Sequence, residues 1–276
     1  MAGYEQGWAA LTGRERTRDR TKRAYRKAGK PRAAKGSKNY AGHWRSALRL
    51  GWSMDNTKLD ARGIVSFGLP AGFAANGFNT CPAKGICAGY CFARQGFYVF
   101  PWVAKVRDRN LAIARSAAFG PALLKDLELL APAGEPRDRR RRRRKRITTI
   151  RVHDSGDFFS LRYLRLWYAA ARAFPELRFY AYTKMFKMLA PAIWDERPKN
   201  FSIVQSVGSL DDEHIDLARP HARVFVDHAD RETAGYVDGL SSEEPAITGE
   251  LKIGLVYHSS NRPLTPGQAK ALRVLP

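Results

Sequence analysis

The chain has 276 residues, of which 44% are hydrophobic and 27% are charged, and its formal net charge at pH 7 is +22. This composition is typical of a globular protein and excludes wholesale disorder, and no apolar stretch approaches the ~18 residues needed to cross a bilayer. No apolar segment follows the basic N-terminal residues as it would in a secretory signal. We therefore expect a soluble, cytoplasmic protein without a membrane partner.

Most of the positive charge lies in two segments. Residues 14–38 hold 12 basic and 2 acidic residues, and residues 137–146 hold 9 basic and 1 acidic residue. Such runs repel themselves, stay solvated and attract phosphate polyanions by counterion release. We predict a flexible, disordered basic arm over 1–38 and a poly-Arg surface loop at 137–146. Sequence-independent binding to DNA or RNA is one interpretation of these runs, and simple solubilisation of the protein is the other.

Residues 39–276 are predicted to form a single α/β domain. Short apolar or β-branched runs predict six strands, at 63–70, 148–154, 177–183, 201–207, 222–228 and 252–258. Apolar periodicity predicts helices at 102–118, 121–130 and 161–174, and shorter ones at 185–194 and 211–217. Strands that alternate with helices favour βαβ units and a parallel sheet. An open doubly wound sheet and an incomplete (β/α)6 barrel both satisfy this pattern.

Polar residues follow the predicted strands, at the end where parallel α/β proteins bind ligands. They are His153, Ser155, Gly156 and Asp157 after the second strand, Lys184 after the third, Gln205 and Ser206 at the end of the fourth, and Asp227 and His228 at the end of the fifth. The first strand leads instead into a loop that contains every cysteine of the chain.

Cys81, Cys87 and Cys91 lie within eleven residues of that Gly-containing loop. An odd number of cysteines in a cytosolic chain argues against a disulfide framework. Three soft thiolates can bind zinc if a fourth ligand completes the tetrahedron. They can also hold an iron–sulfur cluster and leave one iron open for a cofactor. The remaining alternative is three unrelated thiols packed in a loop.

The order of strand, three-cysteine loop, helix and further βα units resembles the partial (β/α)6 TIM-like barrel of radical S-adenosylmethionine enzymes. Those enzymes space their cluster cysteines C-x3-C-x2-C, with an aromatic residue before the last. Tyr90 stands at that position here, but the spacing is C-x5-C-x3-C. The resemblance implies a [4Fe–4S] cluster on the three cysteines, and S-adenosylmethionine as a cofactor.

The sequence also resembles the gene product eighty-eight family of actinobacterial phages. The residues that carry this resemblance are 66–71, 91–93, 109–111, 151–159 and 179–184. Phe92 stands where tyrosine is more usual. The family implies no activity, and a phage protein would work in the cytoplasm of the host cell.

The radical S-adenosylmethionine resemblance implies that the turn formed by Ser155, Gly156 and Asp157 receives the methionine amino group of the cofactor. The alternative is helix capping, with Ser160 as the N-cap that leaves Asp157 free. Gln205 and Ser206 are candidates for ribose hydroxyls, or for satisfying the backbone at the strand end.

The candidate catalytic residues are His153, Lys184, Asp227 and His228. Lys184 would bind a carboxylate or phosphate, unless it only begins a helix. Asp227 and His228 make an acid–base or metal pair, or a hydrogen bond that holds the rim together. Lys105, Arg107, Arg109 and Arg115 are expected mostly on a solvated helix face.

Two functions follow from these features. The favoured one is a phage-type iron–sulfur protein that resembles radical S-adenosylmethionine enzymes, with nucleic acid as an associated partner. The alternative is a non-catalytic, zinc-binding nucleic-acid-binding protein, with His153 or His228 as the fourth zinc ligand.

Overall fold

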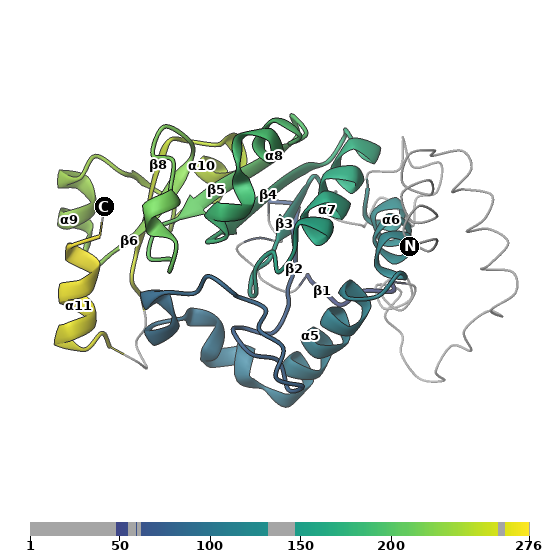
Figure 1. Cartoon of the computed structure of the whole chain (residues 1–276), viewed down its shortest axis with the longest axis horizontal. Coiled ribbons are helices and arrows are strands. Elements are labelled where there is room, and N and C mark those ends of the chain that lie inside the picture. The colour runs from purple at the N-terminus through teal and green to yellow at the C-terminus, as the bar shows by residue number, and fades with distance from the viewer. Residues whose placement is uncertain (1–47, 55–58, 60–61, 132–146, 259–262, 276) are drawn as a thin grey trace, which may run out of the picture.

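A computed structural model describes residues 48–54, 59, 62–131, 147–258 and 263–275. They form an eight-stranded sheet with helices packed against it (Figure 1). The predicted basic arm at 1–38 and the poly-Arg loop at 137–146 lie outside the described residues. Within the described ranges, no helix combines the length and the apolar composition that crossing a bilayer requires.

The sheet consists mainly of parallel strands taken in chain order. The strands are β1 (Trp52–Ser53), β2 (Ile64–Phe67), β3 (Thr149–Val152), β4 (Arg178–Thr183), β5 (Phe201–Ser206), β6 (His221–Phe225), β7 (Val237–Asp238) and β8 (Lys252–Val256). Their spatial order is β1-β2-β3-β4-β5-β6-β8-β7. Strand β1 runs antiparallel to β2, whereas all the other neighbouring pairs are parallel. The predicted α/β class and mostly parallel sheet are confirmed.

Helices fill most of the connections between strands. They are α5 (Pro101–Ala114), α6 (Phe119–Leu130), α7 (Leu161–Ala173), α8 (Pro191–Asp195), α9 (His228–Thr233), α10 (Glu244–Thr248) and α11 (Pro266–Arg273). The long connection from β2 to α5 contains the 3₁₀ turns η1 (Ile86–Gly89), η2 (Phe92–Arg94) and η3 (Gly96–Val99), while η5 (Phe186–Leu189) follows β4 and η6 (Asp212–His214) follows β5. The N-terminus of α7 is capped by Ser160, whose side chain accepts a hydrogen bond from Tyr163 N (3.2 Å).

Both faces of the sheet are buried. In β5, Ile203 belongs to the larger hydrophobic cluster and Val204 to the smaller one, because successive side chains point to opposite faces. The larger cluster joins the sheet to α6 and α7 through Phe67, Phe119 and Trp167, which are fully buried and in ring contact. Burying each such side chain contributes about 1.5–3 kcal/mol. The smaller cluster joins the opposite face to α10.

The sheet is open at both edges. β1 lies beside β2, and β7 lies beyond β8, so the first and last parallel strands do not pair with each other. Of the expected partial (β/α)6 TIM-like barrel, the structure bears out the α/β class and the mostly parallel sheet, and it does not show a barrel.

Two predicted elements end earlier than the sequence pattern indicated. The expected helix at 102–118 ends at Ala114, the last residue of α5, and residues 115–118 form a turn before α6. The expected strand at 222–228 stops at Phe225. It stops because the Asp227 side chain accepts a hydrogen bond from Asp230 N (2.8 Å) and thereby caps α9, in which His228 is the first residue.

Candidate functional site at the carboxyl ends of the strands

The cysteine loop, residues 81–91, is docked on the end of the sheet where the parallel strands finish. Lys84 in the loop and Ser209, just after β5, form an antiparallel bridge. The two backbones approach so closely that a Cβ atom on Gly85 would lie 2.5 Å from the carbonyl oxygen of Gly208. Only glycine permits this approach, and the contact fixes the loop above the carboxyl end of β5.

Helix α11 holds the far end of the loop. Gln268 in its first turn donates a hydrogen bond from Nε2 to the carbonyl oxygen of Gly89 (2.9 Å). The Gln268 side chain also closes a capping box with Thr265 at the start of α11. The loop between Cys81 and Cys91 is thus tied to two elements far from it in the sequence.

The three cysteines carry free thiols and are partly buried. Burial raises the pKa of Cys81 to about 12, and it also raises the pKa of Cys87 and of Cys91. Hydrogen bonds from backbone N–H groups act in the opposite direction on each sulfur. The donors are Gly72 to Cys81, Gly85 to Cys87, and Ala93 and Arg94 to Cys91. At neutral pH the thiols are protonated, so metal binding would have to release their protons.

The thiols lie within electrostatic reach of one another. After the larger effect of burial, the charge of Cys91 raises the pKa of Cys81, and the charge of Cys87 raises the pKa of Cys91. Over the described ranges, however, no three His, Cys, Asp or Glu side chains are gathered closely enough to hold one metal ion. The predicted metal site at the three cysteines therefore stays a prediction.

A partly buried cation, Lys184, lies at the end of β4, beside the loop. Its Nζ donates to the carbonyl oxygens of Ser206 (2.8 Å) and Val207 (2.6 Å) and to Ser206 Oγ (3.0 Å). Burial lowers the pKa of Lys184, while the nearby charges of Cys87 and Asp157 raise it. Its three acceptors are neutral, so its positive charge is balanced only at longer range, by Asp157, Asp212 and the thiols of Cys87 and Cys81. Ser206, predicted as a cofactor contact, serves instead as one of these acceptors.

Two of the predicted cofactor residues, Ser155 and Gly156, form contacts with Leu69 in the loop after β2. Ser155 Oγ donates to the carbonyl oxygen of Leu69 (2.5 Å), and Leu69 N donates to the carbonyl oxygen of Ser155 (2.9 Å). Gly156 has φ +81°, and a Cβ atom there would lie 2.6 Å from Leu69 Cβ. The glycine is needed for close packing against the protein itself.

The Asp157 carboxylate binds the end of β4. It accepts hydrogen bonds from Thr183 Oγ1 (2.6 Å) and Lys184 N (2.9 Å). Burial raises the pKa of Asp157 to about 6, and the hydrogen bonds from Thr183, Lys184 and Phe158 oppose this rise. Asp157 thus contributes a second titratable group close to the thiols.

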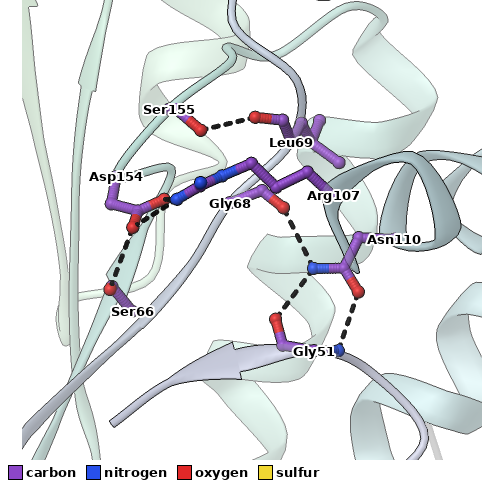
Figure 2. A network of polar contacts seen from close by, with 8 residues as sticks. All are labelled: Gly51, Ser66, Gly68, Leu69, Arg107, Asn110, Asp154 and Ser155. Atoms are coloured by element: carbon purple, nitrogen blue, oxygen red, sulfur yellow. Dashed lines mark hydrogen bonds and ion pairs between the residues drawn. The ribbon is translucent and has the colours of Figure 1, made fainter. Parts of the chain in front are cut away.

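Arg107 and Asp154 form a buried ion pair that the sequence analysis missed (Figure 2). The Arg107 guanidinium reaches both carboxylate oxygens of Asp154, at 2.9 and 3.0 Å, and Ser66 Oγ donates to the same carboxylate (3.4 Å). Lys105, Arg109 and Arg115 are exposed as expected, whereas Arg107 is only 8% exposed. The signal was its spacing from Asn110 and Ala114, since these residues share the buried face of the helix.

Asn110, which the family resemblance singled out without a role, ties β1 to the end of β2. Its Nδ2 donates to the carbonyl oxygens of Gly51 (2.8 Å) and Gly68 (3.0 Å), and its Oδ1 accepts from Gly51 N (2.7 Å). Figure 2 shows the amide between these two backbone segments. Its function is therefore to hold the edge strand in place.

His153 lies within the aromatic core below the site. Its ring packs against Phe158 (centroids 4.6 Å apart), and its Nε2 shares a hydrogen bond with the hydroxyl of Tyr163 (3.0 Å). Its backbone has φ +66°, the only positive φ among the non-glycine residues described. Burial lowers the pKa of His153 to about 3, so the ring is neutral at physiological pH. We assign His153 a packing role.

The remaining candidates lie in structural positions. The Gln205 side chain forms paired hydrogen bonds with the backbone of Asp216, at 2.8 and 3.0 Å, which favours the backbone-satisfying interpretation. Asp227 caps α9, and His228 is exposed at the start of that helix. No described contact brings Asp227 or His228 to the three cysteines, and their acid–base or metal role stays a prediction.

The fold and this site define the class of protein: an open, mostly parallel α/β protein with a three-cysteine loop docked at its strand ends. The chain belongs to the family Gene product 88, whose model matches residues 20–262. The predicted resemblance to this family of phage proteins is confirmed. The comparisons give no support to the resemblance to radical S-adenosylmethionine enzymes.

Two relatives are proteins of mycobacterial phages. The chain is 31% identical over 154 residues to the Gene 88 protein of Mycobacterium phage L5, and 29% identical over 154 residues to that of Mycobacterium phage D29. Each alignment covers 56% of this chain and 60% of the relative, so the chain spans about three fifths of the relatives' length. No solved structure matches the chain significantly.

Proposed function

We propose that this member of the phage family is an iron–sulfur protein whose Cys81, Cys87 and Cys91 hold a [4Fe–4S] cluster. The observation that carries this proposal is the loop itself. It presents three free thiols within electrostatic reach of one another, each with a backbone N–H donor, beside a partly buried cation.

The chemistry of the donor set fits a cluster. Thiolates are the protein ligands of iron–sulfur clusters, and hydrogen bonds to their sulfurs tune the reduction potential. Lys184 lowers the pKa of Cys87, so it favours the thiolate that a cluster needs. Each thiolate of a [4Fe–4S] cluster binds a different iron, so the sulfurs stand farther apart than around one zinc ion.

The topology is a second line of support. Six parallel strands follow one another in chain order, and the cysteine loop comes directly after the first of them, β2. A partial (β/α)6 barrel places its cluster loop in the same order, and we propose that the open sheet is a member of that architecture. In such a fold, functional groups converge at the carboxyl ends of the strands.

We further propose that the protein uses S-adenosylmethionine. Together with a reducible cluster, that cofactor would supply radical chemistry. The predicted cofactor residues Ser155, Gly156 and Asp157 do not fit the methionine group, because their polar groups are taken up within the protein. We therefore assign no residue of this chain to the cofactor.

Metal analysis tests the cluster. Protein purified without oxygen is expected to be brown, with a broad absorbance near about 400 nm and about four irons and four sulfides per chain. Colourless protein with one zinc per chain would overturn the proposal in favour of the zinc alternative.

Cysteine variants test the ligands. Cys81→Ala, Cys87→Ala and Cys91→Ala are each expected to lose most of the iron, since the chain has no other cysteine to replace them. His228→Ala is the matched control, because an exposed histidine away from the loop should leave the iron content unchanged. Loss of metal in the histidine variant, with retention in the cysteine variants, would contradict the assignment.

An activity assay tests the cofactor. Reduced, cluster-replete protein incubated with S-adenosylmethionine is expected to form 5′-deoxyadenosine. Its absence from such protein would reject radical chemistry and leave the cluster with an electron-transfer or structural role.

We also propose DNA or RNA as a partner of the two basic runs at 14–38 and 137–146. Their positive charge supports this proposal, because basic residues bind phosphates and release counterions. Each phosphate contact adds about one unit to the slope of log affinity against log salt concentration. Replacing the arginines of 137–146 with glutamine should flatten that slope. An unchanged slope would remove this run from nucleic-acid binding.

A further inference from the structure

The loop that contains the cysteines continues into an exposed aromatic surface. Phe92, directly after Cys91, is 50% exposed, Phe97 is 76% exposed and Trp102 is 64% exposed. Phe100 joins two of them, with ring centroids 5.3 Å from Phe97 and 4.6 Å from Trp102. We call these four residues, Phe92, Phe97, Phe100 and Trp102, the aromatic platform. Large exposed apolar groups that adjoin one another mark an interaction surface.

The platform lies in a segment of the described chain that is rich in positive charge. Residues 73–110 contain five basic residues and one acidic residue. Arg107 is neutralised by Asp154, but Arg94 and Lys105 are exposed within the platform segment itself. Lys84 lies over the ring of the exposed Phe73, with Nζ 4.1 Å from the centroid. This charge excludes a basic partner and favours an anionic one.

The platform is also adjacent to the candidate cluster site. Phe92 contacts the ring of Tyr98 (centroids 5.5 Å apart), and Tyr98 in turn lies under the guanidinium of Arg107 (4.4 Å). Figure 1 shows the segment between β2 and α5 along one side of the molecule, where the helices around the sheet do not cover it. A ligand on the platform would therefore lie beside Cys91.

We propose that the aromatic platform binds single-stranded nucleic acid, whose bases stack on Phe97 and Trp102 while Arg94 and Lys105 contact the phosphates. Exposed rings interleaved with cations are the means by which proteins bind single strands without sequence preference, because every base has a π-face. In a duplex the base faces are stacked inside the helix and cannot contact the rings. Stacking therefore distinguishes a single strand from a duplex, whereas charge alone would not. This binding requires no metal. The further idea that the bound strand is the substrate of the cluster rests on the proposed function.

The test is oligonucleotide binding by the full chain. The probe is a fluorescein-labelled oligodeoxythymidine of about 12 nucleotides, a length within the usual site size. Phe97→Ala/Trp102→Ala is expected to weaken binding by at least about 30-fold, since stacking contributes about 1–3 kcal/mol per base and the variant lacks two rings. Trp102→Phe, which keeps a ring, should remain within about twofold of the unchanged protein.

Two comparisons separate stacking from charge and from folding. Heparin, a polyanion without bases, should bind the Ala/Ala variant within about twofold of the unchanged protein. Leu217→Ala/Val274→Ala, at exposed apolar residues elsewhere, should bind the oligonucleotide normally. Equal losses for the oligonucleotide and heparin, or no loss for either, would overturn the proposal. The proposal would also be overturned if the unchanged protein were a dimer, the Ala/Ala variant were a monomer, and both bound the oligonucleotide equally. The platform would then be an interface between copies of the chain.

These outcomes are independent of the metal analysis. If the cluster proposal is wrong, the unchanged protein will lack the expected iron, but the oligonucleotide binding of the platform variants will still be as expected. Failure of the platform proposal would leave the iron and sulfide of the unchanged protein in place.

Discussion

A buried and a partly buried cation at the same end of the sheet have different electrostatic surroundings. Arg107, in α5, is held by both oxygens of the Asp154 carboxylate. Lys184, between β4 and β5, donates only to neutral oxygens and lies close to the thiols of the cysteine loop. The first charge is paired directly with a carboxylate, whereas the second is balanced only at longer range, by Asp157, Asp212 and the thiols. The comparison separates a structural cation from a functional one.

The largest expected effect is at the structural cation. Arg107→Ala leaves the Asp154 carboxylate buried without its partner, and removing one member of a buried pair costs about 3–5 kcal/mol. The free energy of unfolding, measured with denaturant, should fall by that amount. Lys105→Ala, at an exposed site of the same helix, should change it by less than about 0.5 kcal/mol. Equal small effects at both positions would show that the Arg107–Asp154 pair does not hold the fold.

A smaller effect is expected at Asp157, on the Lys184 side. Its pKa is raised by burial to about 6, above the unfolded value of 3.8, so folding tightens proton binding. The stability that this group contributes is nearly full below about pH 3 and is lost as the pH rises through 6. The difference in unfolding free energy between the unchanged protein and Asp157→Asn should fall by about 3 kcal/mol from pH 3 to pH 7, at about 1.4 kcal/mol per pKa unit. A difference that is constant or rises with pH would contradict the raised pKa.

The smallest expected effect is at the functional cation itself. Lys184→Met removes a charge that lowers the pKa of Cys87, so the thiol of metal-free protein should ionise less readily. Iodoacetamide should then modify Cys87 about threefold more slowly at pH 8, as followed by mass spectrometry of each cysteine. Lys187→Met, at an exposed lysine paired with Asp211, is the control and should react normally. Identical rates in both variants would show that Lys184 does not act on the thiol.

The regular part of the fold could be predicted from the sequence. Helix α7 and strands β4 and β5 show strong periodicity or continuous apolar runs, and they lie close to where the pattern indicated them. The open edges could not be predicted, because β1 and β7 are two residues long and too short to show a period. The order of the strands in the sheet depends on long-range contacts, which the periodicity of the sequence does not encode.

The candidate site also has a part that could be predicted from the sequence and a part that could not. The cysteine loop and Lys184 follow strands that could be recognised, so their placement at one end of the sheet follows from parallel topology. Arg107 was expected in solvent because its partner Asp154 is 47 residues away in the sequence. His153 adjoins the predicted polar turn, but its positive φ turns the ring into the aromatic core. Local patterns give no information about such turns.

The two shortest strands have a consequence for how copies of the protein meet. An open sheet normally presents a row of unpaired backbone groups at each side, which can template the addition of strands from other molecules. Here both outermost strands, β1 and β7, extend over only two residues. Each side therefore offers too little continuous backbone for a neighbouring chain to extend the sheet, and the geometry disfavours fibril-like stacking of this fold.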